Sequence, residues 1–210
     1  GLDWSTQVSL FDVSDFATKD PQHYKDFYTY LCSLGGGQSF PVALNDFDRD
    51  SILKNMGGYY GTSGIKSFDD IPDNHMNFSY SHAVFEHIWR NEFQDYMHQL
   101  FRVHKNKSLS RHWVDLHDHL GGALNSFRFP PKFWEGSLIK NAGFYTNRLT
   151  MTEMIECARN AGFDVKIEKI HKRKNIPTPL RAMHKSFRHK SEDELNVCTF
   201  LMLLEKNESH

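Results

Sequence analysis

Hydrophobic and polar positions follow two periods along the chain, and these periods predict its secondary structure. Short apolar runs predict strands at 8–13, 108–116, 164–170 and 197–204, with a further short strand before residue 82. Helices are expected at 21–34, 50–56, 93–101 and 151–161, most of them with apolar residues at helical spacing. Strands that alternate with helices predict an α/β fold, in which helices cover both faces of a parallel sheet.

Local signals define the first turns of two of these helices. Asp20 followed by Pro21 is typical of a helix start. Thr150 and Glu153 have the spacing of a capping box, and Gly162 lies where that helix should stop.

Size, charge and cysteine content limit the kind of protein. With 210 residues and ordinary apolar and charged fractions, the chain is most simply a single domain, 1–210. The formal net charge of −1 predicts no nucleic-acid partner, and the basic stretch 166–190 is typical of a solvated face. No apolar run is long enough to cross a membrane, so we expect a cytoplasmic protein. Cys32, Cys157 and Cys198 are odd in number and widely spaced, which predicts buried free thiols.

The segment 71–88 carries the most information about function. It is predicted to form a turn, a short strand that ends in small polar residues, and an abrupt start into an amphipathic helix. Ligands of open parallel sheets bind outside the carboxyl ends of the strands. We therefore expect residues 79–82 to face a bound molecule, while Phe78, Val84 and Ile88 pack inward.

This segment resembles the fourth strand and following helix of class I S-adenosylmethionine-dependent methyltransferases. The shared pattern is a Pro-Asp pair before the strand, a serine at its end and a Glu-His pair in the helix, with Asn77 where the family usually has Asp. The resemblance implies a Rossmann-like sheet and S-adenosylmethionine as cofactor, with Ser81 and His82 beside it. Glu86 and His87 project sideways on a helix, so a structural role is the simpler expectation for both.

Asp12 is a candidate cofactor ligand at the end of the first predicted strand. An acid in this position is commonly a helix cap or part of a solvated turn. However, the segment 12–20 resembles the residues after the second strand in one bacterial methyltransferase group, often encoded near polysaccharide and cell-envelope genes. The resemblance implies that Asp12 accepts hydrogen bonds from the ribose hydroxyls of the cofactor.

A cluster of histidines and aspartates follows the strand predicted at 108–116. Its members are His112, Asp115, His117, Asp118 and His119. Two histidines and a carboxylate can bind a divalent metal, although we predict none here. A His/Asp pair can instead act as general base for a substrate hydroxyl, because imidazole titrates near neutral pH. The third possibility is hydrogen bonding within the loop.

Three blocks of sequence in the same order strengthen the resemblance to that bacterial group. They are 110–120, 124–129 and 143–149, the last reading Gly-Phe-Tyr-Thr-Asn-Arg-Leu. The resemblance implies a substrate-side insertion or lid at 117–149. The acceptor-binding residues that it implies are Arg128, Tyr145, Asn147 and Arg148, with Trp134 as a second ring that could stack on a sugar. The alternative for each of them is packing or a surface ion pair.

The glycine-rich turn that the family places before Asp12 is absent, because the chain begins only eleven residues earlier. We therefore expect an N-terminally incomplete fragment of a mostly parallel methyltransferase sheet, without its first strand and with an antiparallel last strand. Such a chain should bind S-adenosylmethionine weakly or not at all, since backbone N–H groups of that turn normally hold the ligand's carboxylate.

The resemblance implies transfer of a methyl group from S-adenosylmethionine to a hydroxyl or amine of a saccharide or another small polar acceptor. His119, supported by Asp118, is the predicted base. The alternative, from another class, is a non-catalytic binding or assembly module that keeps the fold.

Overall fold

The computed structural model describes residues 8–12, 15–35, 47–55 and 57–207. They fall into two compact units, one within 1–70 and one within 71–210. Each unit is described by itself. The single domain expected from the sequence stays a prediction.

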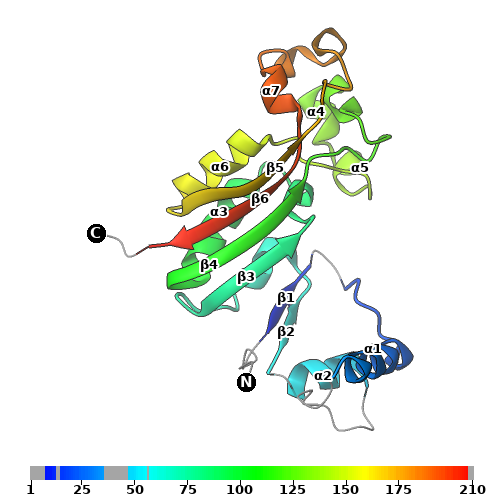
Figure 1. Cartoon of the computed structure of the whole chain (residues 1–210), viewed down its shortest axis with the longest axis vertical. Helices are drawn as coiled ribbons and strands as arrows, with labels where there is room; N and C mark the ends of the chain where they lie inside the picture. Colours follow the sequence, from blue (N-terminus) through cyan, green and yellow to red (C-terminus); the bar gives the residue numbers. More distant parts are fainter. Residues whose placement is uncertain (1–7, 13–14, 36–46, 56, 208–210) are drawn as a thin grey trace. The chain divides into compact units, whose positions relative to one another are not determined.

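The first unit contains a pair of short parallel strands and two helices (Figure 1). β1 (Ser9–Phe11) pairs with β2 (Tyr59–Gly61), and the helices are α1 (Pro21–Ser33) and α2 (Arg49–Asn55). A 3₁₀ turn, η2 (Gly64–Phe68), follows β2. Asp20 caps α1 as predicted, because its carboxylate accepts the N–H of Gln22 at 3.0 Å. Val13, at the end of the predicted first strand, lies outside the described residues.

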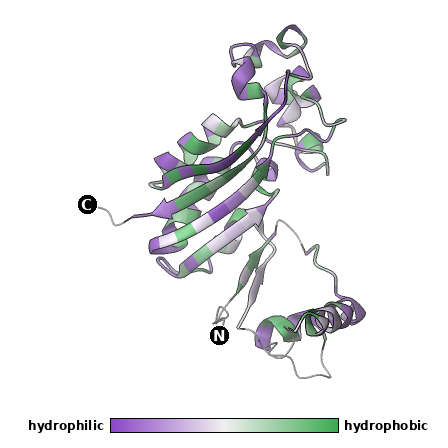
Figure 2. Ribbon diagram, in the orientation of Figure 1, coloured by the Kyte–Doolittle hydropathy of each residue, from purple (hydrophilic) through white to green (hydrophobic). Residues whose placement is uncertain are grey.

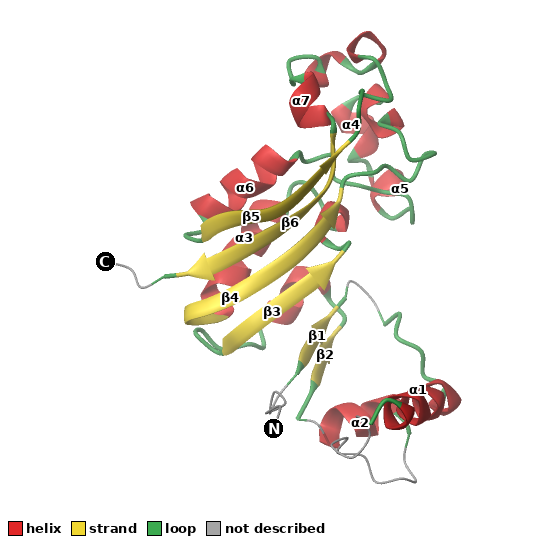
Figure 3. Cartoon of the chain, viewed as in Figure 1, coloured by secondary structure: helices red, strands yellow, loops and turns green. Residues whose placement is uncertain are grey.

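The second unit is built on a four-stranded mixed sheet in the order β3-β4-β6-β5 (Figures 1 and 3). The strands are β3 (Met76–His82), β4 (His104–Asp115), β5 (Asp164–Lys172) and β6 (Val197–Lys206). β3 and β4 are parallel, whereas β6 runs antiparallel to both β4 and β5. The antiparallel last strand is therefore confirmed.

Strand pairing leaves one edge of β1 and one edge of β3 without a described neighbour. Among the described residues, β1 pairs with β2 and β3 pairs with β4. β2 and β5 have such an edge as well. The expectation that the first strand of a methyltransferase sheet is missing stays a prediction.

Two helices pack on the sheet of the second unit. α3 (Phe93–Val103) and α6 (Met151–Asn160) contact each other, and their contacts reach β4, β5 and β6. Met97 and Met154 are fully buried there, as is Phe200 of β6. Figure 2 shows hydrophobic residues along most of β6 and a mixed pattern along β4. The apolar side of this core is thus supplied mainly by β6 and the two helices.

The direction of the β3 side chains differs from the prediction. Phe78 is 55% exposed, whereas Ser79 and Ser81 point toward buried residues of β4. Tyr80, on the same face as Phe78, is 75% exposed. Val84 is also exposed, so two of the three residues expected to pack inward do not. The expectation of helices on both faces is likewise not met around Phe78 and Tyr80, because the α3 side of the sheet is the covered one.

A chain of serine and histidine side chains lies on the covered side of β3 and β4. From one end to the other it contains Ser81, His112, Ser110, Ser79, His104 and Ser108. Each neighbour in this series is hydrogen-bonded to the next; for example, Ser81 Oγ lies 2.7 Å from His112 Nδ1 and Ser79 Oγ lies 2.8 Å from His104 Nε2. Both histidines are buried, so the bonds satisfy polar groups that water cannot reach.

Helix α6 has the predicted ends. The Thr150 N–H donates to Glu153 Oε2 at 2.8 Å, and Thr150 Oγ1 accepts the Glu153 N–H, which forms the capping box. Gly162 follows the helix with a φ of 109°, and a Cβ there would lie 2.9 Å from Phe101 Cζ. Glycine is therefore required both by the backbone and by the neighbouring ring.

The segment 117–149 is composed of short turns. They are η4 (Asn125–Arg128), α4 (Pro131–Trp134) and α5 (Ser137–Lys140). Leu124 and Phe127 of this segment form a small core with Met183, Phe187 and Leu195. The later segment contributes η5 (Leu180–Ala182), η6 (Lys185–Phe187) and α7 (Glu192–Leu195). The two segments thus share a small core beyond the end of the sheet. The role of 117–149 as a lid stays a prediction.

Candidate functional site

The carboxyl ends of β3 and β4 lie at the same edge of the sheet, because the two strands are parallel. A single 3₁₀ turn, η3 (Phe85–His87), follows β3 where the sequence predicted an amphipathic helix. β4 ends at Asp115, and a loop continues through His119. Several titratable residues therefore lie at or after these two strand ends, among them Glu86, His87, Asp115 and His119.

His87 and His119 lie face to face at this edge. Their ring centroids are 5.1 Å apart with an interplanar angle of 23°. His87 Nδ1 lies 2.9 Å from the Tyr145 carbonyl oxygen and must donate to it, which leaves Nε2 as the acceptor of the neutral ring. Burial lowers the pKa of His87, and the nearby His119 lowers it further. His119 itself is exposed, as a base that meets a substrate needs to be.

Asp118 has backbone partners. Its carboxylate is buried and accepts the N–H groups of Leu120 at 3.1 Å and Ser126 at 2.9 Å. Within the described structure it makes no hydrogen bond to His119, whose ring neighbour is His87 instead. Asp118 therefore fixes the loop that carries His119. The role of His119 as base stays a prediction.

The rest of the histidine cluster is divided between the core and the loop. His112 is buried against Phe85, with ring centroids 4.0 Å apart. His117 is bound to Asp115, whose Oδ1 lies 2.5 Å from His117 Nδ1 and accepts the His117 N–H at 2.9 Å. In the described ranges no three His, Cys, Asp or Glu side chains lie close enough together to hold a metal ion.

Glu86, which the sequence analysis took as structural, is the most unusual acid at this edge. It is 2% exposed, and its Oε2 has no hydrogen-bond partner among the described residues. Burial raises the pKa of its carboxyl to about 8, and the nearby Asp115 carboxylate raises it further. A buried acid with an unpaired oxygen beside a strand end is a candidate functional group. The feature of the sequence that could have identified Glu86 as a candidate is its position directly after the strand β3.

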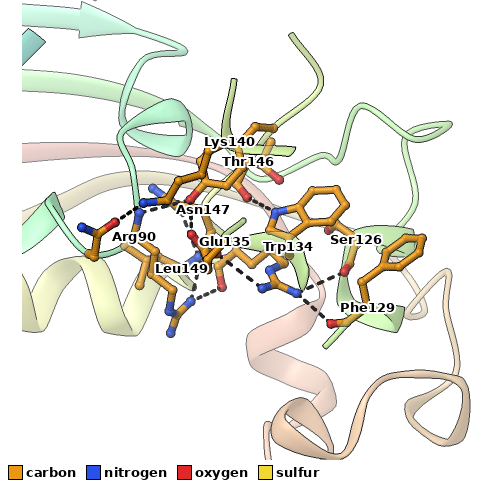
Figure 4. Close-up of polar contacts among 12 residues, drawn as sticks. Arg90, Ser126, Phe129, Trp134, Glu135, Lys140, Thr146, Asn147 and Leu149 are labelled. Atoms are coloured by element: carbon orange, nitrogen blue, oxygen red, sulfur yellow. Dashed lines mark hydrogen bonds and ion pairs between the residues drawn. The ribbon is translucent and has the colours of Figure 1, made fainter. Parts of the chain in front are cut away.

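Three of the predicted acceptor-binding residues are buried and bonded within the chain (Figure 4). Asn147 Nδ2 donates to the carbonyl oxygens of Phe85 and Ile88 at 2.7 and 2.9 Å. Tyr145 Oη donates to Glu135 Oε2 at 2.8 Å. Arg128 differs, since it is exposed. These bonds account for Asn147 and Tyr145 without a ligand, and an acceptor-binding role for them stays a prediction.

Arg148 lies within this buried network. Its guanidinium donates to the carbonyl oxygen of Phe129 at 3.0 Å and lies 3.4 Å from Glu135 Oε1. It also lies over the rings of Trp134 and Phe187, at 5.3 and 4.8 Å from their centroids. Trp134 is 1% exposed, so its ring is covered by protein. Burial lowers the pKa of Arg148 to about 10, and the Glu135 carboxylate offsets part of this effect.

The three residues expected at the cofactor differ in how well they fit a ribose or an adenine. Asp12 follows β1, and its backbone is held by the Gly61 carbonyl at 2.8 Å and the Gly64 N–H at 3.0 Å. His82 ends β3 and is exposed, with its ring 6.1 Å from that of Trp113. The Ser81 hydroxyl already has a partner, because it is bonded to His112 on the covered side of the sheet, and its place beside the cofactor stays a prediction. Asp12 and His82 thus keep side chains of the type that such a ligand needs.

Comparison with known proteins supports the fold. The chain resembles a crystal structure of a SAM-dependent methyltransferase from Methanosarcina mazei, with a TM-score of 0.53 and 12% identity over 96% of this chain and 83% of that one. The YcgJ protein from Bacillus subtilis matches with a TM-score of 0.48 at 10% identity, covering 97% of this chain and 84% of that one. A SAM-dependent methyltransferase from Archaeoglobus fulgidus matches with a TM-score of 0.46 at 12% identity, covering 95% and 86%.

The first of these likenesses establishes the fold and nothing finer, because its identity is low. No family model matches the chain, and no curated protein matches it in sequence. The chain thus has the Rossmann-like α/β fold of class I S-adenosylmethionine-dependent methyltransferases. In the described part of the chain, no helix is long and apolar enough to span a membrane.

Proposed function

We propose that this chain belongs to an S-adenosylmethionine-dependent methyltransferase that modifies a hydroxyl or amine of a saccharide or another small polar acceptor. The acceptor binds at the carboxyl edge of β3 and β4, and His119 is the base. Asp118 positions His119 by fixing its loop to the backbone at Leu120 and Ser126. Arg128 is exposed, and although its Nε donates to Asn125 Oδ1 at 2.9 Å, its other N–H groups can meet an anionic group of the acceptor.

One observation carries this proposal. The edge where ligands of such folds bind is the edge where Glu86, His87, Asp115 and His119 follow the strands. Burial raises the pKa of Glu86 to about 8 and lowers the pKa of His87, and shifted pKa values are common among groups that exchange protons in an active site.

S-adenosylmethionine would supply the methyl group. Of the residues of this chain, Asp12 would hold the ribose through its carboxylate, and His82 would lie beside the adenine. His119 would take the proton from the acceptor, since its imidazole is exposed and an imidazole nitrogen can accept a proton.

Calorimetry with S-adenosylhomocysteine tests the proposal. The sample is the longest natural polypeptide that contains these 210 residues, with Asp12→Ala as variant and Asp26→Ala, an exposed acid on α1, as matched control. We expect micromolar binding that Asp12→Ala weakens by about tenfold or more, the value of one charge-assisted hydrogen bond. The control should bind like the unchanged protein.

Absence of binding by that polypeptide would overturn the proposal and favour a non-catalytic binding or assembly module.

A further inference from the structure

The cavity beside Glu86 is lined by both polar and apolar residues at the edge of the second unit. Its polar lining comes from Glu86, Asp115, Thr146, Asn147, Arg148, Thr150 and Glu194. Its volume is about 20 Å³, which is room for one water-sized group. A ligand can therefore place a single small polar group there, while the rest of the molecule stays outside.

The other charged groups around the cavity have partners within the chain, whereas Glu86 Oε2 has none among the described residues. Arg148 is paired with Glu135, and Glu194 lies 3.7 Å from Lys190. Asp115 is bound to the His117 ring. Within the described residues Glu86 forms no ion pair and its Oε2 accepts no hydrogen bond, although the residue is 98% buried. An unpaired buried acceptor that lines a cavity requires a donor from outside the chain.

We infer that this cavity binds the protonated amino group of a small amine, with Glu86 as its ion-pair partner. An ammonium group has the right size, donates the missing hydrogen bond and neutralises the carboxylate in the same contact. This makes the acceptor an amine-bearing molecule such as an amino sugar, a step that rests on the proposed function. The amine binding itself does not depend on methyl transfer.

A bound water is the competing occupant. Arg148 Nε also lacks a partner among the described residues, and a water can accept from it while donating to Glu86. An ammonium group cannot accept a hydrogen bond, so the two occupants differ in their response to added amine. If water is sufficient, small amines will have no specific effect on Glu86.

The ammonium site should also depend on pH in a defined direction. In the ligand-free protein the Glu86 carboxyl is mostly protonated below pH 8, whereas an alkylammonium ion keeps its proton beyond pH 9. The other charged groups that line the cavity are Asp115, Glu194 and the paired Arg148. Amine binding should therefore strengthen by about tenfold between pH 7 and pH 9, as the fraction of ionised Glu86 increases.

Methylammonium chloride is the probe, with sodium chloride and tetramethylammonium chloride as controls. Tetramethylammonium has the same charge but has no N–H and is too large for the cavity. We expect methylammonium to shift the ¹³C resonance of the Glu86 carboxyl, lower its pKa and raise the melting temperature. Glu86→Gln should weaken this binding by about tenfold or more, whereas Glu156→Gln, an exposed acid on α6, should not change it.

Equal responses to methylammonium and tetramethylammonium, or an unchanged Glu86 pKa, would overturn the inference. If Glu86→Gln does not fold, the NMR titration of the unchanged protein decides by itself. The experiment contains no methyl donor, so its result is separate from the S-adenosylhomocysteine test. Amine binding without S-adenosylhomocysteine binding would reject the methyltransferase proposal and keep the amine site.

Discussion

His87 stacks on His119, and the same His87 ring donates its Nδ1 hydrogen to the carbonyl oxygen of Tyr145. The partly buried ring thus provides a fixed surface for the exposed one. An exposed imidazole that is held by a neighbouring ring has fewer rotamers to lose when a substrate arrives.

If His119 is the base, His119→Ala should lower methyl transfer by about 10²–10⁴-fold and change the dependence of the rate on pH. His98→Ala, which changes an exposed histidine of α3, is the matched control and should keep full activity. Rates measured with radiolabelled donor across about pH 6 to 9 give the answer. An unchanged pH profile in His119→Ala would mean that another group accepts the proton from the acceptor.

The buried histidines of β4 should make the protein unstable in acid. Burial lowers the pKa of His104 to about 4 and that of His112 to about 3, and a positive neighbour adds to each shift. Since the unfolded chain binds these protons near pH 6.5, stability is present above that pH and is lost as pH falls toward 4 and then 3. The loss from His104 amounts to roughly 3 kcal/mol.

Denaturant melts of His112→Asn between about pH 7 and pH 4 test this effect. The variant should be less stable at neutral pH, because Ser81 and Ser110 lose a partner, yet it should lose less stability on acidification. His98→Asn should keep the acid sensitivity of the unchanged protein. The same slope in all three proteins would show that His112 does not titrate as a buried group.

Glu86 should lower the stability of the protein at alkaline pH, whereas the buried histidines lower it in acid. Its pKa is raised from 4.5 to about 8, so its contribution to stability is present below about pH 4.5 and is lost as pH rises through 8. The full shift corresponds to at most about 5 kcal/mol. Glu86→Gln should flatten this decline between pH 5 and pH 9 in denaturant melts, and Glu156→Gln should retain it. A decline of equal size in Glu86→Gln would place the titrating group elsewhere.

Arg148 and Arg128, both predicted to bind an acceptor, should differ in how much stability is lost when each is replaced by lysine. Arg148→Lys removes a buried guanidinium from Glu135 and from the Trp134 ring, and should cost about 2–4 kcal/mol of unfolding free energy. Arg128→Lys changes an exposed side chain and should stay within about 0.5 kcal/mol. Thermal melts of both variants provide the comparison. Similar losses would mean that the Arg148 network contributes little.

The sequence by itself determined the elements whose signals are local. The Asp20 cap, the capping box of Thr150 and Glu153, and the stop at Gly162 each depend on residues within one or two turns of a helix, and all three are confirmed. The antiparallel last strand was obtained from the resemblance to a known sheet, and the pairing of β6 with β4 and β5 confirms it.

The tertiary structure decided which face of β3 is covered and which acid is buried. Alternation along a strand shows that Phe78 and Ser79 point opposite ways, but not which side the helices occupy, and polar partners at His104 and Ser110 place the serine inside. Glu86 is enclosed by residues that come much later in the chain, such as Asn147, whose N–H donates to the Glu86 carbonyl. Burial and pKa depend on such distant neighbours, which no local period in the sequence can specify.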